Sequence, residues 1–429
     1  MDADFTLRRF GAGSNADGSA DPQTLAWLES TAIGFLGDPL SPEHAARTVE
    51  SFQRDDRVLT GVHDPTASRS GWAADHPVAT FATLRKTLNV GGGRLIPAHL
   101  IADVTVLATH RGRGLLRRMM EDDLGRAAAD GLPVAALYGA DAGLYTRYGF
   151  GPATRTQRAE VDVRRMRFTR TPSGTVVVVD PDALREAIPA VDGELHRTTL
   201  GSVQRLASHA AEVCGQWPQH PPGPHPTVRG ALHVSDGGVP DGYVTFRFRG
   251  WGERPLAIDV VALVALTPDA HLGLWGHLAA QALAEVVRIE NLPPDDPLPW
   301  LLADRRAMRV VGEQDGVWLR ILDPEVCLRE RLHDATGDPL TLRVHDELGI
   351  CPGAYRIVPA SRGTEVTKVP DGAADAVLDA DALASLFLGG YTAASLERAG
   401  RIRGAAPGVV ARLDRLFGSG PAPYTDTHF

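Results

Sequence analysis

The chain has 429 residues, of which 43% are hydrophobic and 23% are charged, and these are ordinary values for a folded globular protein. Its length exceeds that of one typical domain and predicts about two to four domains. The formal net charge of −9 argues against a nucleic-acid binder, which would present a basic face. The same charge is compatible with a cationic small substrate.

Cysteine use and hydropathy limit the location of the protein. The three cysteines, Cys214, Cys327 and Cys351, are widely spaced, which argues against a disulfide framework and against a zinc or redox pair. The acidic N-terminus has no apolar signal core, and the longest apolar run, around residues 260–266, is too short to span a bilayer. We therefore expect a cytoplasmic protein with no membrane span and no metal, and secretion by another route stays open.

The first third of the chain alternates between strand and helix patterns. Proline follows a capping residue at positions 21–22 and 41–42, which is a helix start signal. We expect a strand at 4–10, helices at 21–36 and 41–53, and strands at 58–63, 78–89 and 95–106.

Residues 104–120 form the most informative segment. A short apolar strand, Val-Thr-Val, leads into the turn Arg111-Gly112-Arg113-Gly114, and an amphipathic helix follows. Glycines let the backbone approach an anion closely, and the amides and dipole of a helix start favour negative charge. This order predicts a phosphate-binding loop, to which Arg117 adds further positive charge.

Two common phosphate-binding loops do not fit this segment. A dinucleotide-binding loop needs a third glycine, which the run Gly-Arg-Gly-Leu-Leu-Arg from Gly112 lacks. A P-loop ends in Gly-Lys-Ser/Thr, which is also missing.

Downstream, the apolar run at 134–138 reads as a strand covered on both faces. The segment Leu-Tyr-Thr-Arg-Tyr-Gly-Phe at 144–150 then predicts a short helix and another strand. In order and spacing, these elements resemble the GNAT acetyltransferase fold.

A weaker copy of the same pattern occurs further along the chain. Residues 260–268 read as a buried strand ending at Pro268, and a helix is expected at 270–285, with another at 203–213. Where the first copy has paired glycines and arginines, the second has His271-Leu-Gly-Leu, so we expect a degenerate unit without pyrophosphate binding. From residue 317 onward, short strands precede small helices.

An active GNAT unit, a degenerate one and a small α/β domain together resemble the Eis (enhanced intracellular survival) family over the full length. The most specific matches are Val104-Thr-Val, the run from His110 to Arg117, Tyr145, and the run Tyr-Gly-Phe-Gly-Pro-Ala-Thr at 148–154. The resemblance implies an α/β fold with an acetyl-CoA-binding GNAT domain at 1–157, a degenerate GNAT-like domain at 158–316, and a domain similar to sterol carrier proteins at 317–429. Gly112 is a departure, because many relatives carry another arginine there.

The family resemblance also implies a site. Backbone groups of the splayed strand bind the pantetheine arm and the thioester carbonyl, and the loop binds the pyrophosphate. Tyr145 is the expected general acid, and the C-terminal carboxylate of Phe429 the expected general base. The expected acetyl-CoA contacts are Val104, Thr105, Val106, Gly112, Arg113, Gly114, Leu115, Leu116, Arg117, Ala140 and Asp141.

Three functions remain open from the sequence. The first is transfer of acetyl from acetyl-CoA to primary amines of polycationic small molecules, such as aminoglycosides or polyamine-like compounds. The second keeps this chemistry but uses a lysine side chain of a protein or peptide as acceptor. The third is a lipid- or small-ligand-binding protein in which the GNAT unit is regulatory. The resemblance also implies a homo-oligomer, specifically a hexamer.

Overall fold

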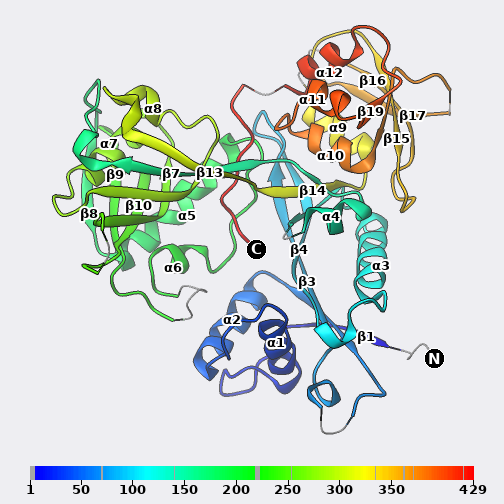
Figure 1. The fold of residues 1–429 in the computed structure, drawn as a ribbon, viewed down its shortest axis with the longest axis horizontal. Helices are drawn as coiled ribbons and strands as arrows, with labels where there is room; N and C mark the ends of the chain where they lie inside the picture. Colours follow the sequence, from blue (N-terminus) through cyan, green and yellow to red (C-terminus); the bar gives the residue numbers. More distant parts are fainter. Residues whose placement is uncertain are drawn as a thin grey trace.

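The computed structural model describes residues 5–68, 71–139, 141–217, 223–252, 254–333, 335–360, 363–370, 372–418 and 420–429. In this part of the chain the strands form two seven-stranded sheets and one five-stranded sheet, each with helices packed against it (Figure 1). The C-terminus lies between the first and second units (Figure 1). No helix among the described residues is long and apolar enough to cross a membrane.

The first sheet contains most of the strands expected in the first third of the chain. Its helices are α1 (Pro22–Gly34), α2 (Pro42–Arg54), α3 (Leu115–Ala129) and α4 (Ala142–Tyr145). The predicted strands at 58–63, 95–106 and 134–138 are confirmed at both ends. In spatial order the strands are β1 (Thr6–Gly11), β2 (Val58–His63), β3 (Ala79–Asn89), β4 (Leu95–Val106), β5 (Val134–Tyr138), β14 (Val317–Ile321) and β6 (Gly151–Pro152).

Helices cover both faces of the first sheet. Ala82 of β3 and Ala102 of β4 belong to an apolar cluster with α1 and α2. Their chain neighbours Phe81 and Ile101 belong to the cluster that contains α3. Since successive residues of a strand point to opposite faces, α1 and α2 lie on one side of the sheet and α3 on the other.

The second sheet has the same strand order as the first when it is followed from the opposite edge. Its helices are α5 (Pro181–Thr198), α6 (His209–Val213), α7 (Pro268–Ala279) and α8 (Leu298–Leu301). In spatial order its strands are β13 (Met308–Asp315), β7 (Arg155–Asp162), β12 (Val286–Leu292), β11 (Ala257–Ala265), β10 (Pro240–Phe248), β9 (Arg229–Val234) and β8 (Thr175–Val179).

The two units exchange one strand each. β7, which follows the first unit in sequence, lies between β12 and β13 of the second sheet, and β14, which follows the second unit, lies between β5 and β6 of the first. The expected division at residue 317 therefore does not match the sheet, because residues 317–321 complete the first unit rather than begin the third domain. Likewise, the expected division at residue 157 cuts through β7.

The third domain is small and packs directly on the first sheet. Its helices are α9 (Pro324–Arg331), α10 (Ala380–Phe387), α11 (Ala393–Arg398) and α12 (Val409–Phe417). The Arg320 guanidinium of β14 forms a buried ion pair of 2.6 Å with Asp346 of this domain. In spatial order its strands are β17 (Glu365–Val369), β16 (Gly353–Val358), β15 (Leu340–His345), β18 (Ala376–Asp379) and β19 (Ile402–Arg403).

Two expected helices are shorter than predicted. The helix expected at 203–213 is helical only over α6, because the backbone amide and carbonyl of Val203 bond to the hydroxyls of Thr425 and Thr427 instead. The helix expected at 270–285 ends at Ala279, six residues before the expected end and ahead of strand β12.

Candidate active site

The centre of the first sheet opens between β4 and β5. The two strands pair in parallel from Ala98 opposite Val134 to Leu100 opposite Ala136, and the pairing ends there. β4 continues to Val106 with hydrogen bonds only to β3 on its other side. The backbone of Val104, Thr105 and Val106 therefore faces a gap in the sheet rather than a neighbouring strand, as expected for a strand that binds an extended ligand arm.

A β-bulge turns β4 at the start of this gap. The register with β3 shifts between Thr80 and Ala82, and Asp103 adopts a φ of 54°, which is rare for a residue with a side chain. The Asp103 carboxylate bonds to the buried Arg57 guanidinium at 3.1 Å, and Thr80 donates to the Asp103 carbonyl at 2.9 Å. These contacts hold the strained residue in place. Burial raises the pKa of Asp103, and Arg57 opposes that shift.

The two faces of the splayed strand carry different side chains. Val104 and Val106 pack against the apolar cluster of α3. Thr105 points to the opposite face, where its hydroxyl meets that of Thr80 at 2.7 Å. A Cβ on Gly34, at the end of α1, would overlap the Thr105 side chain. α1 therefore packs directly against the strand beside the gap.

The predicted phosphate-binding loop has the required backbone. Gly112 and Gly114 adopt φ values of 75° and 76°, and no atom lies within 4 Å of a Cβ built on either. The first hydrogen bond at the start of α3 runs from the Arg118 amide to the Gly114 carbonyl. The amides of Leu115, Leu116 and Arg117 precede it and point out of the helix end, where an anion can accept from them.

The arginines of this loop are not all directed at the helix end. Arg111 and Arg113 donate to the backbone carbonyls of Val106 and Thr109. Arg117 pairs with Glu121 at 2.7 Å, one turn along the helix. Each guanidinium keeps further N–H donors, so both these side chains and the backbone amides of the helix start are available to an anion.

Tyr145, the expected acid, ends α4. It is 7% exposed and belongs to the apolar cluster of α3, against which Val104 and Val106 also pack. Burial raises the pKa of its phenol, with further contributions from Asp141 and Tyr148. The phenol therefore stays protonated at neutral pH. Asp141 accepts from the Leu144 amide and caps this helix, while Ala140 lies outside the described residues.

Phe429, the expected base, lies on the other face of the first sheet. Its ring packs against the cluster of α1 and α2 and lies 5.3 Å from the ring of Tyr138, the last residue of β5. Thr105 and Phe429 are thus on the α1 side of the gap, and Tyr145 is on the α3 side. A thioester passing through the gap would lie between the two expected catalytic groups.

The segment that carries Phe429, which we name the C-terminal tail (residues 420–429), is held by both GNAT units. The Tyr424 phenol donates to the Asn291 carbonyl of β12 at 2.9 Å, and Arg205 pairs with Asp426 at 2.7 Å. The Tyr138 phenol donates to the Thr427 carbonyl at 2.8 Å. The sequence predicts Tyr138 only as the last residue of a strand. No local sequence pattern predicts its contact with the tail.

The second unit has a different helix start at the matching position. Thr267 caps α7 through its hydroxyl, and Pro268 is the first helical residue. The paired left-handed glycines of the first unit are missing there. In the described residues, no group of three histidine, cysteine, aspartate or glutamate side chains is arranged to hold a metal ion.

Fold and site together define a tandem GNAT acetyltransferase. Residues 49–153 and 201–321 match two family models described as an acetyltransferase (GNAT) domain, and residues 326–426 match a sterol carrier protein domain. The predicted fold of two GNAT units followed by a sterol-carrier-like domain is therefore confirmed. Acetyltransferases of this class use acetyl-CoA as the acetyl donor.

Whole-chain relatives carry the same assignment. An uncharacterized N-acetyltransferase of Streptomyces avermitilis is 33% identical over 427 residues, covering 96% of this chain and 97% of the relative. N-acetyltransferase Eis of Mycobacterium tuberculosis is 34% identical over 355 residues, covering 80% and 83%. The crystal structure of Eis1 from Mycobacterium abscessus aligns with a TM-score of 0.80 at 27% identity, covering 99% of this chain and 100% of that one. The chain belongs to the Eis family of GNAT N-acetyltransferases.

Proposed function

We propose that this N-acetyltransferase transfers acetyl from acetyl-CoA to primary amines of polycationic small molecules, such as aminoglycosides or polyamine-like compounds. The observation that carries the mechanism is the position of Phe429 on the α1 face of the first sheet, against Tyr138 at the end of β5. This position supports a role for the terminal carboxylate beside the gap through which the thioester enters.

In the proposed reaction the carboxylate of Phe429 takes a proton from the ammonium group, directly or through a water molecule. The free amine attacks the thioester carbonyl, whose developing negative charge is stabilised by backbone amides of Val104–Val106. The carbon–sulfur bond breaks, and Tyr145 gives its phenolic proton to the departing thiolate. The nitrogen loses its second proton as the amide forms, and this proton restores the Tyr145 phenol through solvent. The proton held by the Phe429 carboxylate is released to solvent, so the products are the amide, coenzyme A and one proton.

The loop of residues 112–117 is proposed to bind the pyrophosphate of the donor. The left-handed glycines and the open space beside them support close approach of a phosphate group. Asp141 and Ala140 are proposed to line the lower part of the coenzyme arm, on the basis of their position directly after β5.

A cationic acceptor is favoured by the net charge of the chain, since the Asp103 carboxylate beside the gap is already paired with the Arg57 guanidinium. The overall charge of −9 favours approach of a polycation.

A panel of amines tests this proposal. Coenzyme A release would be measured with an aminoglycoside, spermidine and a lysine-containing peptide as acceptors. Turnover with the small polycations at higher kcat/KM than with the peptide supports the proposal. Turnover with the peptide alone would replace it with protein acetylation, and release with none of the acceptors would contradict it.

The proposal extends to assembly and location. We propose a cytoplasmic location, as expected from the sequence, and a homohexamer, as the family resemblance implies. Light scattering after size-exclusion chromatography would measure the mass of the protein in solution. A mass equal to that of one 45.8 kDa chain would contradict the hexamer.

A further inference from the structure

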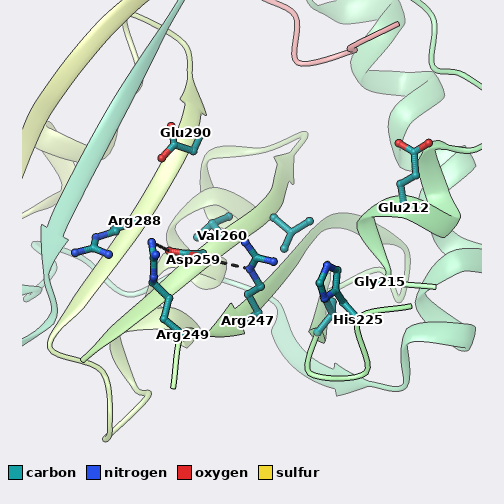
Figure 2. A pocket seen from close by; sticks show the side chains of 11 residues that line it. Glu212, Gly215, His225, Arg247, Arg249, Asp259, Val260, Arg288 and Glu290 are labelled. Carbon is teal, nitrogen blue, oxygen red and sulfur yellow. Dashed lines mark ion pairs between the residues drawn. The ribbon is translucent and has the colours of Figure 1, made fainter. Parts of the chain in front are cut away.

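The second GNAT unit has a gap in its sheet like that of the first. β11 and β12 pair in parallel from Ala257 opposite Val286 to Val260 opposite Ile289, and the pairing ends there. In both units the neighbouring antiparallel ladder carries a register shift. Figure 2 shows the end of the pairing from the cavity beside it, with Val260 on β11 and Glu290 on β12. The gap therefore resembles that of the first unit in backbone, while the helix start of α7, within the described residues, lacks the paired glycines.

The C-terminal tail lies against this gap. The register of β12 with β7 also shifts between Ile289 and Leu292, so the backbone of Asn291 lies outside both ladders. Its carbonyl accepts the hydrogen bond of the Tyr424 phenol at 2.9 Å, and its side-chain amide lies 3.4 Å from Nε2 of His428. A cavity of about 250 Å³ at the gap is lined by β11, β12, α6 and the tail. In the second unit, therefore, the end of the strand beside the gap binds a segment of the same chain.

A buried arginine of the second unit holds this segment near its end. The Arg205 side chain is 12% exposed, and its Nη1 lies 2.7 Å from the Asp426 carboxylate. The same nitrogen donates to the Thr427 hydroxyl at 3.2 Å. On the other side of the guanidinium, Nε lies 3.5 Å from Asp192 of α5. Arg205 therefore joins α5 to the two residues that precede His428 and Phe429.

The second unit also fixes the position of the arginine. Asp192 is buried and accepts a hydrogen bond of 2.9 Å from the phenol of Tyr243, which is fully buried on β10. The other carboxylate oxygen of Asp192 lies 3.3 Å from Nε2 of His209 on α6. Since buried groups that bond to one another strengthen and rigidify their network, the guanidinium is held where it meets the tail.

We propose that Arg205 is a positioning residue for the terminal carboxylate, and that the degenerate GNAT unit serves to dock the C-terminal tail at its gap. This inference rests on the proposed function, in which the carboxylate of Phe429 is the base. Arg205 contacts the side chains of Asp426 and Thr427 rather than the reacting atoms, so it acts through the tail. A base must lie within hydrogen-bond reach of the proton it takes, and a displacement of about 1 Å can lower a rate about a hundredfold.

A double-mutant cycle with a polyamine as acceptor tests this proposal. Arg205→Met removes the guanidinium, one alanine appended after Phe429 moves the terminal carboxylate, and a third variant combines the two changes. Arg205→Met alone is expected to lower kcat at least tenfold while the Kd for acetyl-CoA stays unchanged. In the appended background the carboxylate is already displaced, so the same substitution is expected to lower kcat less than twofold. A purely structural role of Arg205 would lower kcat by the same factor in both backgrounds.

The cycle separates this inference from the proposed function. A wild-type kcat for the appended variant would show that the terminal carboxylate is not the base, and so overturn the proposed mechanism together with its positioning. A slow appended variant combined with a wild-type kcat for Arg205→Met would overturn the positioning role alone. Equal losses in the two backgrounds would do the same.

Further variants keep the test valid if Arg205→Met is unstable, since breaking a buried ion pair can be strongly destabilising. Asp426→Asn keeps the shape of the side chain but removes its charge, and is expected to lower kcat at least threefold in the natural background only. Arg331→Met is the matched control, because it removes a guanidinium that binds the carbonyls of Phe387 and Phe417 in the third domain. It is expected to leave kcat unchanged. A loss of kcat in Arg331→Met as large as that in Arg205→Met would overturn the assignment.

Discussion

The phenol of Tyr138 donates a hydrogen bond of 2.8 Å to the carbonyl of Thr427, and so joins the last residue of β5 to the C-terminal tail. The rings of His428 and Phe429 pack against the same tyrosine, at 4.8 Å and 5.3 Å between centroids. One side chain at the edge of the gap in the first sheet therefore positions the residue that we propose as the base.

Removing this hydrogen bond is expected to impair catalysis more than folding. Tyr138→Phe leaves the Thr427 carbonyl without its partner, so we expect a loss of about 1–2 kcal/mol in the free energy of unfolding. We also expect kcat to fall by about tenfold or more, because a small displacement of a catalytic group is costly. Tyr391→Phe, which removes a phenol hydrogen bond to Asp315 in another part of the molecule, should lower kcat far less. Equal effects of the two variants would argue against a positioning role for Tyr138.

The proposed phosphate-binding loop can be tested with two glycines that flank helix α3. Gly114 and Gly131 flank α3 with φ values of 76° and 75°, and both have open space where a Cβ would lie. Alanine at either position should cost about 1–2 kcal/mol in stability through backbone strain. Only Gly114→Ala places a methyl group where the pyrophosphate is proposed to bind, so only this variant should raise the KM for acetyl-CoA, by about tenfold. A matching rise in Gly131→Ala would show that strain alone is responsible.

Tyr145 should affect kcat rather than donor binding. Tyr145→Phe removes the proposed acid, and we expect kcat to fall about 100-fold or more with little change in the KM for acetyl-CoA. Because the protonated phenol is the active form and its pKa is raised above 10.0, activity should not decline through Tyr145 until the pH exceeds that value. Initial rates between pH 6 and 10 would check both points. Tyr148→Phe is the control. A wild-type kcat for Tyr145→Phe would contradict the role of Tyr145 as the acid.

Acid sensitivity is expected at the junction of the two GNAT units. The imidazole of His196 on α5 meets the Thr87 hydroxyl of β3 at 2.8 Å, and burial together with Arg205 lowers its pKa to about 4 from 6.5. Between these two values the unfolded chain binds a proton that the folded chain does not, so stability falls as the pH is lowered through this window. The Tm of the wild type should therefore drop more steeply from pH 7 to 4 than that of His196→Gln. Parallel Tm curves would contradict this assignment.

Much of the first unit follows from local pattern. Strands β2, β4 and β5 have predictable ends because apolar runs or alternation stop at turn residues. Gly112 and Gly114 of the proposed phosphate-binding loop adopt the positive φ values that glycine favours. The helix starts at Pro22 and Pro42 are equally local, because Asp21 and Ser41 cap them as the sequence indicates.

What the sequence does not predict depends on partners far along the chain. β14 reads as a strand of the third domain, yet it completes the first sheet, because a short apolar strand carries no signal for its neighbour. Residues 203–208 have a helical sequence pattern but form no helix. The backbone amide and carbonyl of Val203 instead form hydrogen bonds with the C-terminal tail, more than 200 residues away in the chain. The bulge at Asp103 and its ion pair with Arg57 likewise arise from tertiary contacts.

The most direct measurement concerns the last residue. A variant with one alanine appended after Phe429 moves the terminal carboxylate while keeping every side chain of the tail. We predict that kcat for a polyamine falls at least 100-fold, while the Kd for acetyl-CoA and the Tm stay at their wild-type values. A variant that turns over at the wild-type rate would contradict the terminal carboxylate as the base.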